Sequence, residues 1–374
     1  MAPSLDPYTD VVALTAALVD FPSESHHELL LADEVERQLA GLVHLEVVRI
    51  GNTVVARTQL GHAQRVLLGG HLDTVSEADN GRAIIVRAGE LLPVVGPDGA
   101  TTCSEDRLYG LGSSDMKGGV AVMLRLAAQL TQPRVDLTFV FYDCEEVASE
   151  HNGLEKLAAT FPDLLNADLA ILMEPSEAGV EAGCQGTLRA EIRVTGRRAH
   201  SARGWLGENA VHVAGEFLAR LSSYEARSPV IDGLQYREGM NAVGIRGGVA
   251  GNVIPDECVV TVNYRFAPDR SVDEAEREVR AMAEGFEVRV VDNAAGALPH
   301  LDLPLAAQFV AAVGTPPRPK YGWTDVARFA AAGIPAVNFG PGSPNVAHAR
   351  HECVPLADLH RCENVLREWL QARE

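Results

Sequence analysis

Acidic and histidine side chains follow three apolar segments of the chain, each where the apolar run stops. Short apolar runs bounded by polar residues are typical of buried strands, and the carboxyl ends of parallel strands meet at one edge of a sheet. We therefore expect these side chains to lie close together. The runs are 65–70, 136–142 and 168–173, followed respectively by His71 and Asp73, by Glu145 and Glu146, and by Glu174.

Two further candidates lie outside these runs. Asp115 belongs to the glycine-rich turn Tyr109–Gly119, which opens a predicted helix, and His348 lies in the loop Asn345–His351. Imidazole nitrogen and carboxylate oxygen are ligands suited to zinc and related ions. Two histidines and three carboxylates match a pair of ions that share one carboxylate, about 3.5–4 Å apart, and activate a water.

Such a site predicts hydrolysis at a carbonyl carbon. Activated water attacks the carbonyl, and a base that is not a metal ligand passes a proton to the leaving amine. The adjacent pair Glu145 and Glu146 offers one ligand and one base. Taken singly, the two glutamates also fit a solvated surface, His71 fits a polar core position, and His348 fits a surface position. A phosphate loop is disfavoured because the glycine-rich turn lacks the GxxxxGK[ST] spacing.

The elements that must position these groups alternate between helices and strands. The alternation predicts an α/β fold, with a mostly parallel mixed sheet and helices on both faces. Besides the three strands, the periodicity of apolar residues predicts a hairpin around Gly51–Asn52 within 45–58 and helices over 8–20, 26–42, 118–130 and 153–159.

From Thr187 the order changes to strand, helix, strand, strand, helix, strand. This βαββαβ order is the ferredoxin-like pattern of an α+β domain. After residue 294 the earlier rhythm resumes and ends in an amphipathic helix from Leu356. We expect a catalytic metal-binding domain formed by 1–180 and 293–374, interrupted by an inserted domain over 181–292.

The composition and the lack of targeting patterns favour a cytoplasmic protein that acts on small molecules. The 374 residues include 51 acidic and 32 basic side chains, and the formal charge of −19 disfavours nucleic-acid partners. The six cysteines contain no CxxC pair, as expected of reduced thiols. We find no secretory signal pattern and no apolar run of about 20 residues, so a membrane partner is not expected.

Four motifs resemble the signatures of the zinc-dependent aminoacylase and carboxypeptidase family, which includes acetylornithine deacetylases and succinyl-diaminopimelate desuccinylases. They occur in the family's order, and the resemblance extends over nearly the whole chain. It implies a zinc exopeptidase-like fold, two zinc ions that cobalt or manganese can replace, and a homodimer. The motifs are Gly70–Val75, Tyr109–Gly118, Asp143–Glu146 and Met173–Pro175.

The resemblance also implies a role for each candidate at the metals. Glu145 would be the general acid/base, and Asp73 would orient the ring of a ligand histidine, as second carboxylates commonly do. His348 is preferred to His351 because the segment AHARHE resembles the family's final histidine followed by an acid. The implied ligands are His71 and Glu174 for one ion, Glu146 and His348 for the other, and Asp115 as the bridge.

In the inserted domain, the resemblance implies groups that bind the substrate. Because His200 lies in this domain whereas the implied ligands lie in the other, we expect the inserted domain to close over the metals as a lid. His200 would polarise the scissile carbonyl, often across a dimer interface. Arg265 would form a bidentate pair with a substrate carboxylate. The other implied substrate contacts are Asn252 and Arg203 in this domain and Gly340 in the catalytic domain.

Within the family, the segments 183–189, 198–207, 323–329 and 338–342 look most like succinyl-diaminopimelate desuccinylases of the high-GC Gram-positive type. This implies hydrolysis of N-succinyl-L,L-2,6-diaminopimelate to succinate and L,L-diaminopimelate, on the route to lysine. The alternatives are an N-acetylornithine-type deacetylase, a carboxypeptidase, or a catalytically silent metal- or ligand-binding relative. Many relatives have an acid where this chain has Cys144. Many also have an arginine-containing turn where this chain has Cys184–Gly186, so one succinyl-carboxylate contact is unassigned.

Overall fold

The structure, a computed structural model, describes residues 5–93, 99 and 101–371. Contacts between Cα atoms divide the chain into two compact units. The larger comprises Met1–Ala182, His300–Arg318 and Arg328–Glu374, and the smaller comprises Gly183–Pro299 and Pro319–Ala327. The expected catalytic and inserted domains, as bodies that fold and move separately, remain a prediction.

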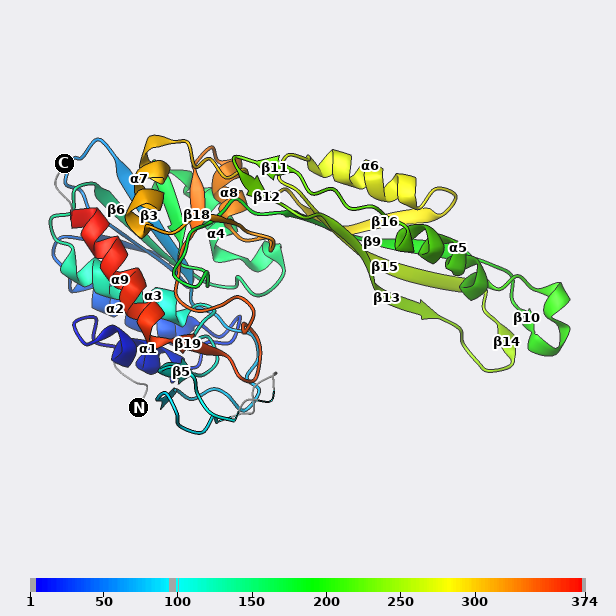
Figure 1. Ribbon diagram of the computed structural model, residues 1–374, viewed down its shortest axis with the longest axis horizontal. Helices are drawn as coiled ribbons and strands as arrows, with labels where there is room; N and C mark the ends of the chain where they lie inside the picture. Colours follow the sequence, from blue (N-terminus) through cyan, green and yellow to red (C-terminus); the bar gives the residue numbers. More distant parts are fainter. Residues whose placement is uncertain (1–4, 94–98, 100, 372–374) are drawn as a thin grey trace. The chain divides into compact units, whose positions relative to one another are not determined.

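A mixed eight-stranded sheet forms the centre of the larger unit (Figure 1). Four neighbouring strands are parallel, whereas the β1–β2 hairpin joins β6 in antiparallel fashion and β8 is antiparallel to β18. The mostly parallel α/β architecture is therefore confirmed. The strand order is β1 (Glu46–Ile50), β2 (Thr53–Arg57), β6 (Asp136–Tyr142), β3 (Arg65–His71), β7 (Leu169–Leu172), β18 (Ala336–Asn338), β8 (Glu181–Ala182) and β17 (Arg318–Pro319).

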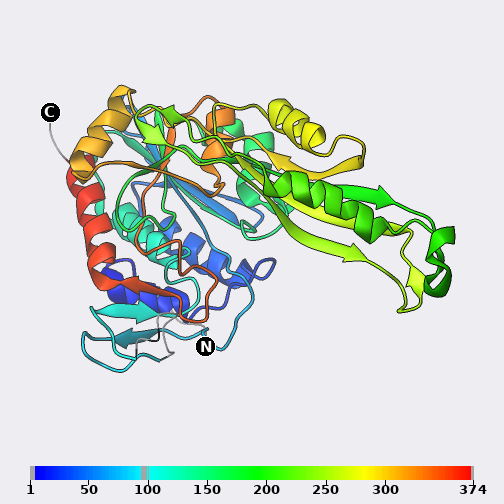
Figure 2. The same cartoon turned by 45° about the vertical axis from the view of Figure 1, so that its right-hand side comes forward.

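The parallel strands are buried because helices cover the sheet. Every residue of β6 is buried, as are the last six of β3, which explains their continuous apolar sequences. Figures 1 and 2 show α4 on the opposite side of the sheet from α3 and α9. The helices are α1 (Val11–Val19), α2 (Leu29–Ala40), α3 (Lys117–Gln129), α4 (Gly153–Thr160), α7 (Pro304–Val313), α8 (Val326–Ala331) and α9 (Leu356–Gln371).

Helix α2 starts three residues later than the apolar period indicates. His26 has φ 73°, which lies outside the helical region. The preceding segment runs beside the residues that follow β3: the N–H of Thr74 donates to the carbonyl of Ser23, and the N–H of Ser25 donates to that of Thr74. Tertiary pairing with the end of β3 thus overrides the local helical pattern.

A small three-stranded sheet, which the sequence did not predict, also belongs to the larger unit. It has the order β19 (Cys353–Pro355), β5 (Arg107–Tyr109), β4 (Ile84–Val86). Strands of three residues are too short to show a two-residue period. The sheet pairs Tyr109 with Cys353, and so joins the start of the glycine-rich turn to the chain just after the Asn345–His351 loop.

The smaller unit is an antiparallel sheet of order β13-β15-β9-β16 with two helices. Its chain order is the predicted βαββαβ. In β9, buried residues alternate with partly or fully exposed ones, so one face forms a core and the other carries charged pairs such as Arg193–Glu257. The elements are β9 (Gly186–Thr195), α5 (Ala210–Ser222), β13 (Gly239–Gly247), β15 (Glu257–Phe266), α6 (Val272–Met282) and β16 (Glu287–Ala294).

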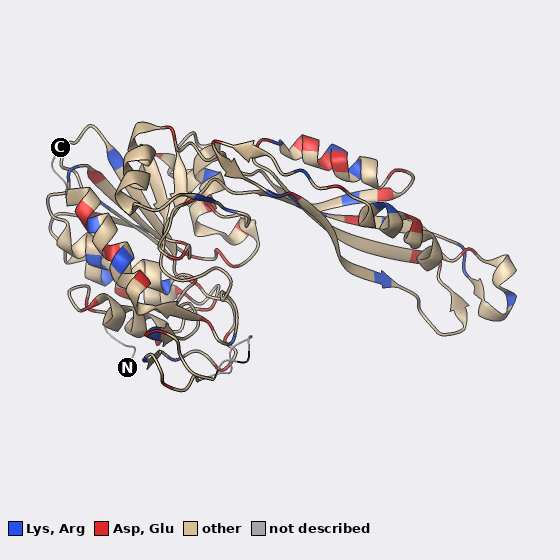
Figure 3. Ribbon diagram, viewed as in Figure 1, with Lys and Arg blue, Asp and Glu red and all other residues tan. Residues whose placement is uncertain are grey.

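Shorter elements complete the fold. Acidic and basic side chains are interspersed along α6 and α9 (Figure 3). Among the described residues, no helix has both the length and the apolar composition needed to cross a membrane. The short elements are the strand pairs β10 (Ala199–His200) with β14 (Val253–Ile254) and β11 (Val230–Ile231) with β12 (Leu234–Gln235), and the 3-10 helices η1 (Ser149–His151), η2 (Pro162–Leu164) and η3 (Ser201–Leu206).

The carboxylate of Asp136 at the start of β6 generates a stability prediction. It accepts hydrogen bonds from the N–H groups of Leu60 and His62 and from the hydroxyl of Thr58. Burial opposes its charge, but these donors outweigh burial and lower its pKa. Asp136→Asn should reduce the free energy of unfolding by about 1–3 kcal/mol at pH 7, measured by denaturant titration.

The pH dependence follows from the sign of this shift. A carboxyl whose pKa is lowered by folding stabilises the protein above its unfolded pKa of about 3.9, and this stabilisation is lost as pH falls through the folded value. The difference in free energy of unfolding between wild type and Asp136→Asn should therefore become smaller below about pH 4. A difference in free energy of unfolding that does not change with pH would contradict the role assigned to the charge of Asp136.

Candidate metal centre

His71 ends β3 with its imidazole almost completely buried and both ring nitrogens facing oxygen atoms. Nδ1 lies 3.0 Å from the carbonyl oxygen of Asp73 and 3.5 Å from its Oδ1, so Nδ1 is the donor. Nε2 lies 3.1 Å from Oδ1 of Asp115. Burial lowers the pKa of His71, but Asp115 and Asp73 outweigh burial and raise it well above its ordinary value. Because Nδ1 donates to Asp73, Nε2 is the nitrogen available to a metal.

Asp115 lies between the two histidines. Its Oδ1 faces His71, and its Oδ2 lies 3.4 Å from Nε2 of His348. Burial opposes the charge, but the two imidazoles hold the pKa of this carboxyl far below its usual range. Glu352 fixes the backbone here, because its Oε1 accepts the N–H groups of Ser114 and Asp115, each at 3.0 Å. One oxygen toward each histidine is the arrangement that a bridging carboxylate requires.

Glu146 and His348 complete this side of the cluster. His348 Nε2 lies 2.9 Å from Oε1 of Glu146, and hydrogen bonds to Asp115 and Glu146 raise the pKa of His348 to about 10. His348 has φ 61°, a conformation uncommon outside glycine and frequent at functional sites. Ligand atoms of His71, Asp115 and Glu146 all lie within 4.8 Å of one another.

The Asp73 side chain connects His71 to the two glutamates. Its Oδ1 accepts the N–H of Glu145 at 3.0 Å, and its Oδ2 accepts the N–H of Glu146 at 3.1 Å and the hydroxyl of Ser25 at 2.7 Å. Burial opposes the charge of Asp73, but His71 and these donors lower its pKa. A single buried carboxylate therefore positions the His71 ring and the backbone of the Glu145–Glu146 pair.

The donor set fits a borderline divalent ion. Around a tetrahedral ion with bonds of about 2.0–2.2 Å, neighbouring ligand atoms lie about 3.3–3.6 Å apart. The Nε2 atoms of His71 and His348 face carboxylate oxygens at 2.9–3.4 Å, close to such separations. The carboxylates raise the pKa values of His71 and His348 because they attract positive charge, and they would attract a metal cation for the same reason. Imidazole nitrogen with carboxylate oxygen is the combination typical of zinc.

Glu174 and Gly340 follow the next two strands of the sheet, β7 and β18, each by two residues. Glu174 is buried and follows β7, the neighbour of β3, by two residues. A Cβ at Gly340 would collide with the carbonyls of Met173 and Glu174, so only glycine lets these two segments approach. The structure thus places Gly340 against the backbone that carries Glu174, whereas its predicted contact with substrate stays a prediction.

Residues 67–372 match the sequence profile of peptidase family M20/M25/M40. This chain belongs to that family. A Mycobacterium tuberculosis protein, named provisionally as succinyl-diaminopimelate desuccinylase DapE, is 53% identical over 98% of this chain and 99% of its own length. The succinyl-diaminopimelate desuccinylase of Corynebacterium glutamicum is 44% identical over 99% of this chain and 98% of its own length.

A solved structure supports the same family fold. The M20 family metallo-carboxypeptidase Sso-CP2 of Sulfolobus solfataricus matches with a TM-score of 0.72 at 16% identity, over 97% of this chain and 98% of that one. The resemblance noted in the four motifs is therefore confirmed for the family and for the fold. The roles of single residues are predictions that rest on the geometry described above.

The predicted substrate residues of the smaller unit lie on short elements. His200 ends β10, is exposed, and accepts the N–H of Ala202 on Nδ1 at 3.0 Å. The carbonyl of Asn252 accepts the N–H of Ser201, which joins the His200 and Asn252 segments. Arg203 lies exposed within η3. Arg265 on β15 is half-buried, which lowers its pKa, and its Nε donates to Asn263.

Sequence reasoning missed three polar side chains. Glu352 holds the turn that carries Asp115, and its only signal was an acid shortly after His348. Ser25 bonds to Asp73 from the residue just before the predicted helix 26–42. Gln185 is 1% exposed, and neither polar atom of its amide has a partner among the described residues. It lies in the turn where the succinyl-carboxylate contact was left unassigned.

The contacts of Asp73 predict its effect on metal affinity. Asp73→Ala removes the carboxylate beside His71 and leaves the N–H groups of Glu145 and Glu146 without an acceptor. We expect zinc affinity to fall by about 10–100-fold, as for other residues that orient a ligand. Competition with a chromogenic chelator measures this. Unchanged affinity in a folded Asp73→Ala protein would contradict the assignment.

Proposed function

We propose that this chain is a metal-dependent amide hydrolase that converts N-succinyl-L,L-2,6-diaminopimelate to succinate and L,L-diaminopimelate, in lysine and diaminopimelate biosynthesis. The observation that carries the proposal is identity of 53% and 44% to two desuccinylases along almost the whole chain. The cluster of His71, Asp115, Glu146 and His348 supplies the chemical basis.

We propose two zinc ions for this cluster, with cobalt or manganese as substitutes. When bound, such ions polarise a carbonyl group and make water a stronger nucleophile. Asp115 would serve both ions, since its two oxygens face different histidines. The remaining ligands would be His71 with Glu174 and Glu146 with His348.

Glu145 would move the proton in this reaction. Its backbone N–H is fixed by Asp73, next to the ligand Glu146. The carboxylate would accept a proton from the attacking water and deliver it to the nitrogen of the departing amine, so that the amide C–N bond breaks without forming an amide anion. Asp73 holds the loop in place during both transfers.

Groups of the smaller unit would bind the anionic substrate. His200 would donate to the carbonyl oxygen as negative charge develops on it. Arg265 would bind a carboxylate through its guanidinium fork, with Asn252 and Arg203 as further contacts from the same unit. Gly340 of the larger unit would add one more contact. The half-buried position of Arg265 supports this role, because an ion pair is stronger where water is partly excluded.

The direct test uses metal-stripped protein with two substrates. N-succinyl-L,L-diaminopimelate should be hydrolysed after zinc is added, and N-acetylornithine much more slowly, with succinate and acetate measured separately. Glu145→Gln should retain bound zinc and lose about 10²–10⁴-fold in kcat. Preference for the acetyl compound would favour the deacetylase alternative, and inactivity on both would favour a silent binding relative.

We also propose a cytoplasmic homodimer formed through the smaller unit. Strand β13 is at the edge of its sheet, and its Val243 and Ile245 side chains are 60% and 57% exposed. An edge strand with apolar side chains is suited to pairing with a second copy.

The cysteines support the proposed cytoplasmic location. The six cysteines are all free and buried, as expected in a reducing compartment.

The dimer is tested at the edge strand. Ile245→Lys places a charge on β13 and should shift the chain from dimer to monomer in sedimentation velocity. Val249→Lys, at an exposed position beyond the strand, is the matched control and should leave the dimer intact. A monomeric wild-type chain at micromolar concentration would refute the proposal.

A further inference from the structure

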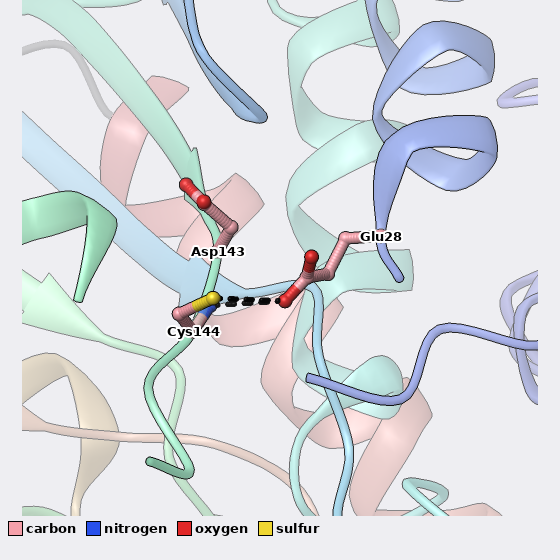
Figure 4. Close-up of side chains that lie close together, drawn as sticks. All are labelled: Glu28, Asp143 and Cys144. Atoms are coloured by element: carbon pink, nitrogen blue, oxygen red, sulfur yellow. Dashed lines mark hydrogen bonds between the residues drawn. The ribbon is translucent and has the colours of Figure 1, made fainter. Parts of the chain in front are cut away.

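Glu28 is a carboxylate that the metal centre does not explain. It precedes α2, its side chain is completely buried, and it lies beside Asp143 and Cys144 (Figure 4). No ion pair to Glu28 occurs among residues 5–93, 99 and 101–371. A buried carboxyl group without an ion-pair partner needs hydrogen bonds, so its contacts identify its role.

The contacts of Glu28 are directed at the loop that follows β6. Its Oε1 accepts the N–H of Cys144 and the thiol of Cys144, both at 3.3 Å, and the N–H of His26 at 2.9 Å. Its Oε2 accepts the side-chain amide of Asn52 at 3.4 Å. Both the backbone and the side chain of Cys144 are therefore bound to one carboxylate.

Cys144 needs such support because its backbone is strained. Its φ is 57°, a left-handed conformation that costs about 1–3 kcal/mol for a residue with a Cβ. Such a conformation persists only where surrounding contacts determine it. The strained residue directly precedes Glu145 in sequence.

Three consecutive N–H groups of the loop are bound by two buried carboxylates. Glu28 accepts the N–H of Cys144, and Asp73 accepts those of Glu145 and Glu146. Glu28 fixes the start of the loop from the α2 side, and Asp73 fixes its continuation from the β3 side. The backbone N–H of Glu145 and those of both its neighbours are therefore held by these two carboxylates.

We propose that Glu28 is a positioning residue for the hydrolysis, acting through Cys144 on the placement of Glu145. The inference rests on the proposed function, because it takes Glu145 as the general acid/base. Glu28 does not touch the reacting atoms. It stabilises the backbone conformation from which Glu145 reaches the proton that it transfers.

The same three side chains also resemble a small cation site, since ligand atoms of Glu28, Asp143 and Cys144 lie within 4.8 Å of one another. Their hydrogen bonds favour the positioning role. Asp143 Oδ1 accepts the hydroxyl of Thr53 at 2.7 Å, and Glu28 Oε1 accepts the thiol of Cys144. Donors of the chain thus already bind Asp143 Oδ1 and Glu28 Oε1, two of the oxygens that could face an ion.

The experiment compares Glu28→Ala with Glu28→Gln in the full chain loaded with zinc. Glu28→Ala removes the acceptor, so kcat on N-succinyl-L,L-diaminopimelate should fall about 10–100-fold, as expected when a reacting group is displaced. KM and the number of bound zinc ions should stay unchanged. Glu28→Gln keeps an oxygen acceptor for Cys144 and should recover most of kcat.

The matched control is Glu363→Ala. Glu363 is also a buried carboxylate of the larger unit, but it bonds to Arg125 and Arg367 instead of the loop. Its loss should lower the melting temperature and leave kcat of the folded protein unchanged. A purely structural role for Glu28 predicts the same behaviour in Glu28→Ala, and that result would overturn the proposal.

Hydrogen exchange separates failure of this proposal from failure of the proposed function. In Glu28→Ala, amides in the segment 143–147 should lose protection, and Glu28→Gln should keep it. This readout needs no substrate, so it decides the positioning role even if wild type is inactive on the succinyl compound. Unchanged protection, or loss of one bound metal equivalent in Glu28→Ala, would overturn the proposal.

Discussion

Carboxylates that accept backbone N–H groups hold this metal centre together. Asp73 binds the N–H groups of Glu145 and Glu146, and Glu352 binds those of Ser114 and Asp115. The side chains that would bind cations are thus set by a second layer of buried carboxyl groups. A carboxylate can accept several N–H bonds at once and orient a loop that has no helix or strand of its own. Without this layer, the strand ends would bring the ligands to one edge but leave their directions undetermined.

The parts of the site that follow buried strands were predictable from the sequence. Three apolar runs correspond to buried strands: β3 ends at His71, β6 precedes Glu145, and β7 precedes Glu174. Strands covered on both faces are continuously apolar, which is why these runs could be recognised. The βαββαβ order of the smaller unit was also visible, since its helices and strands are long enough to show their periods.

The supporting residues were not predictable for a physical reason. Glu28 and Glu352 act across separations of 116 and 237 residues, on Cys144 and Asp115, through backbone groups that leave no trace in side-chain patterns. His26 lies in the predicted helix 26–42, and only pairing of the neighbouring Ser25 with the end of β3 removes it from that helix. Local periodicity reports burial, whereas these contacts depend on which loops meet after folding.

The pairing of Tyr109 with Cys353 has a consequence for the order of events during synthesis. It joins the turn that carries Asp115 to a segment from the last tenth of the chain, which also supplies His348 and Glu352. A nascent chain that has completed the central strands and the whole smaller unit still lacks one histidine and one supporting carboxylate. The proposed ligand set can therefore assemble only after residue 352 has been synthesised, later than the smaller unit, so metal loading would follow the folding of that unit.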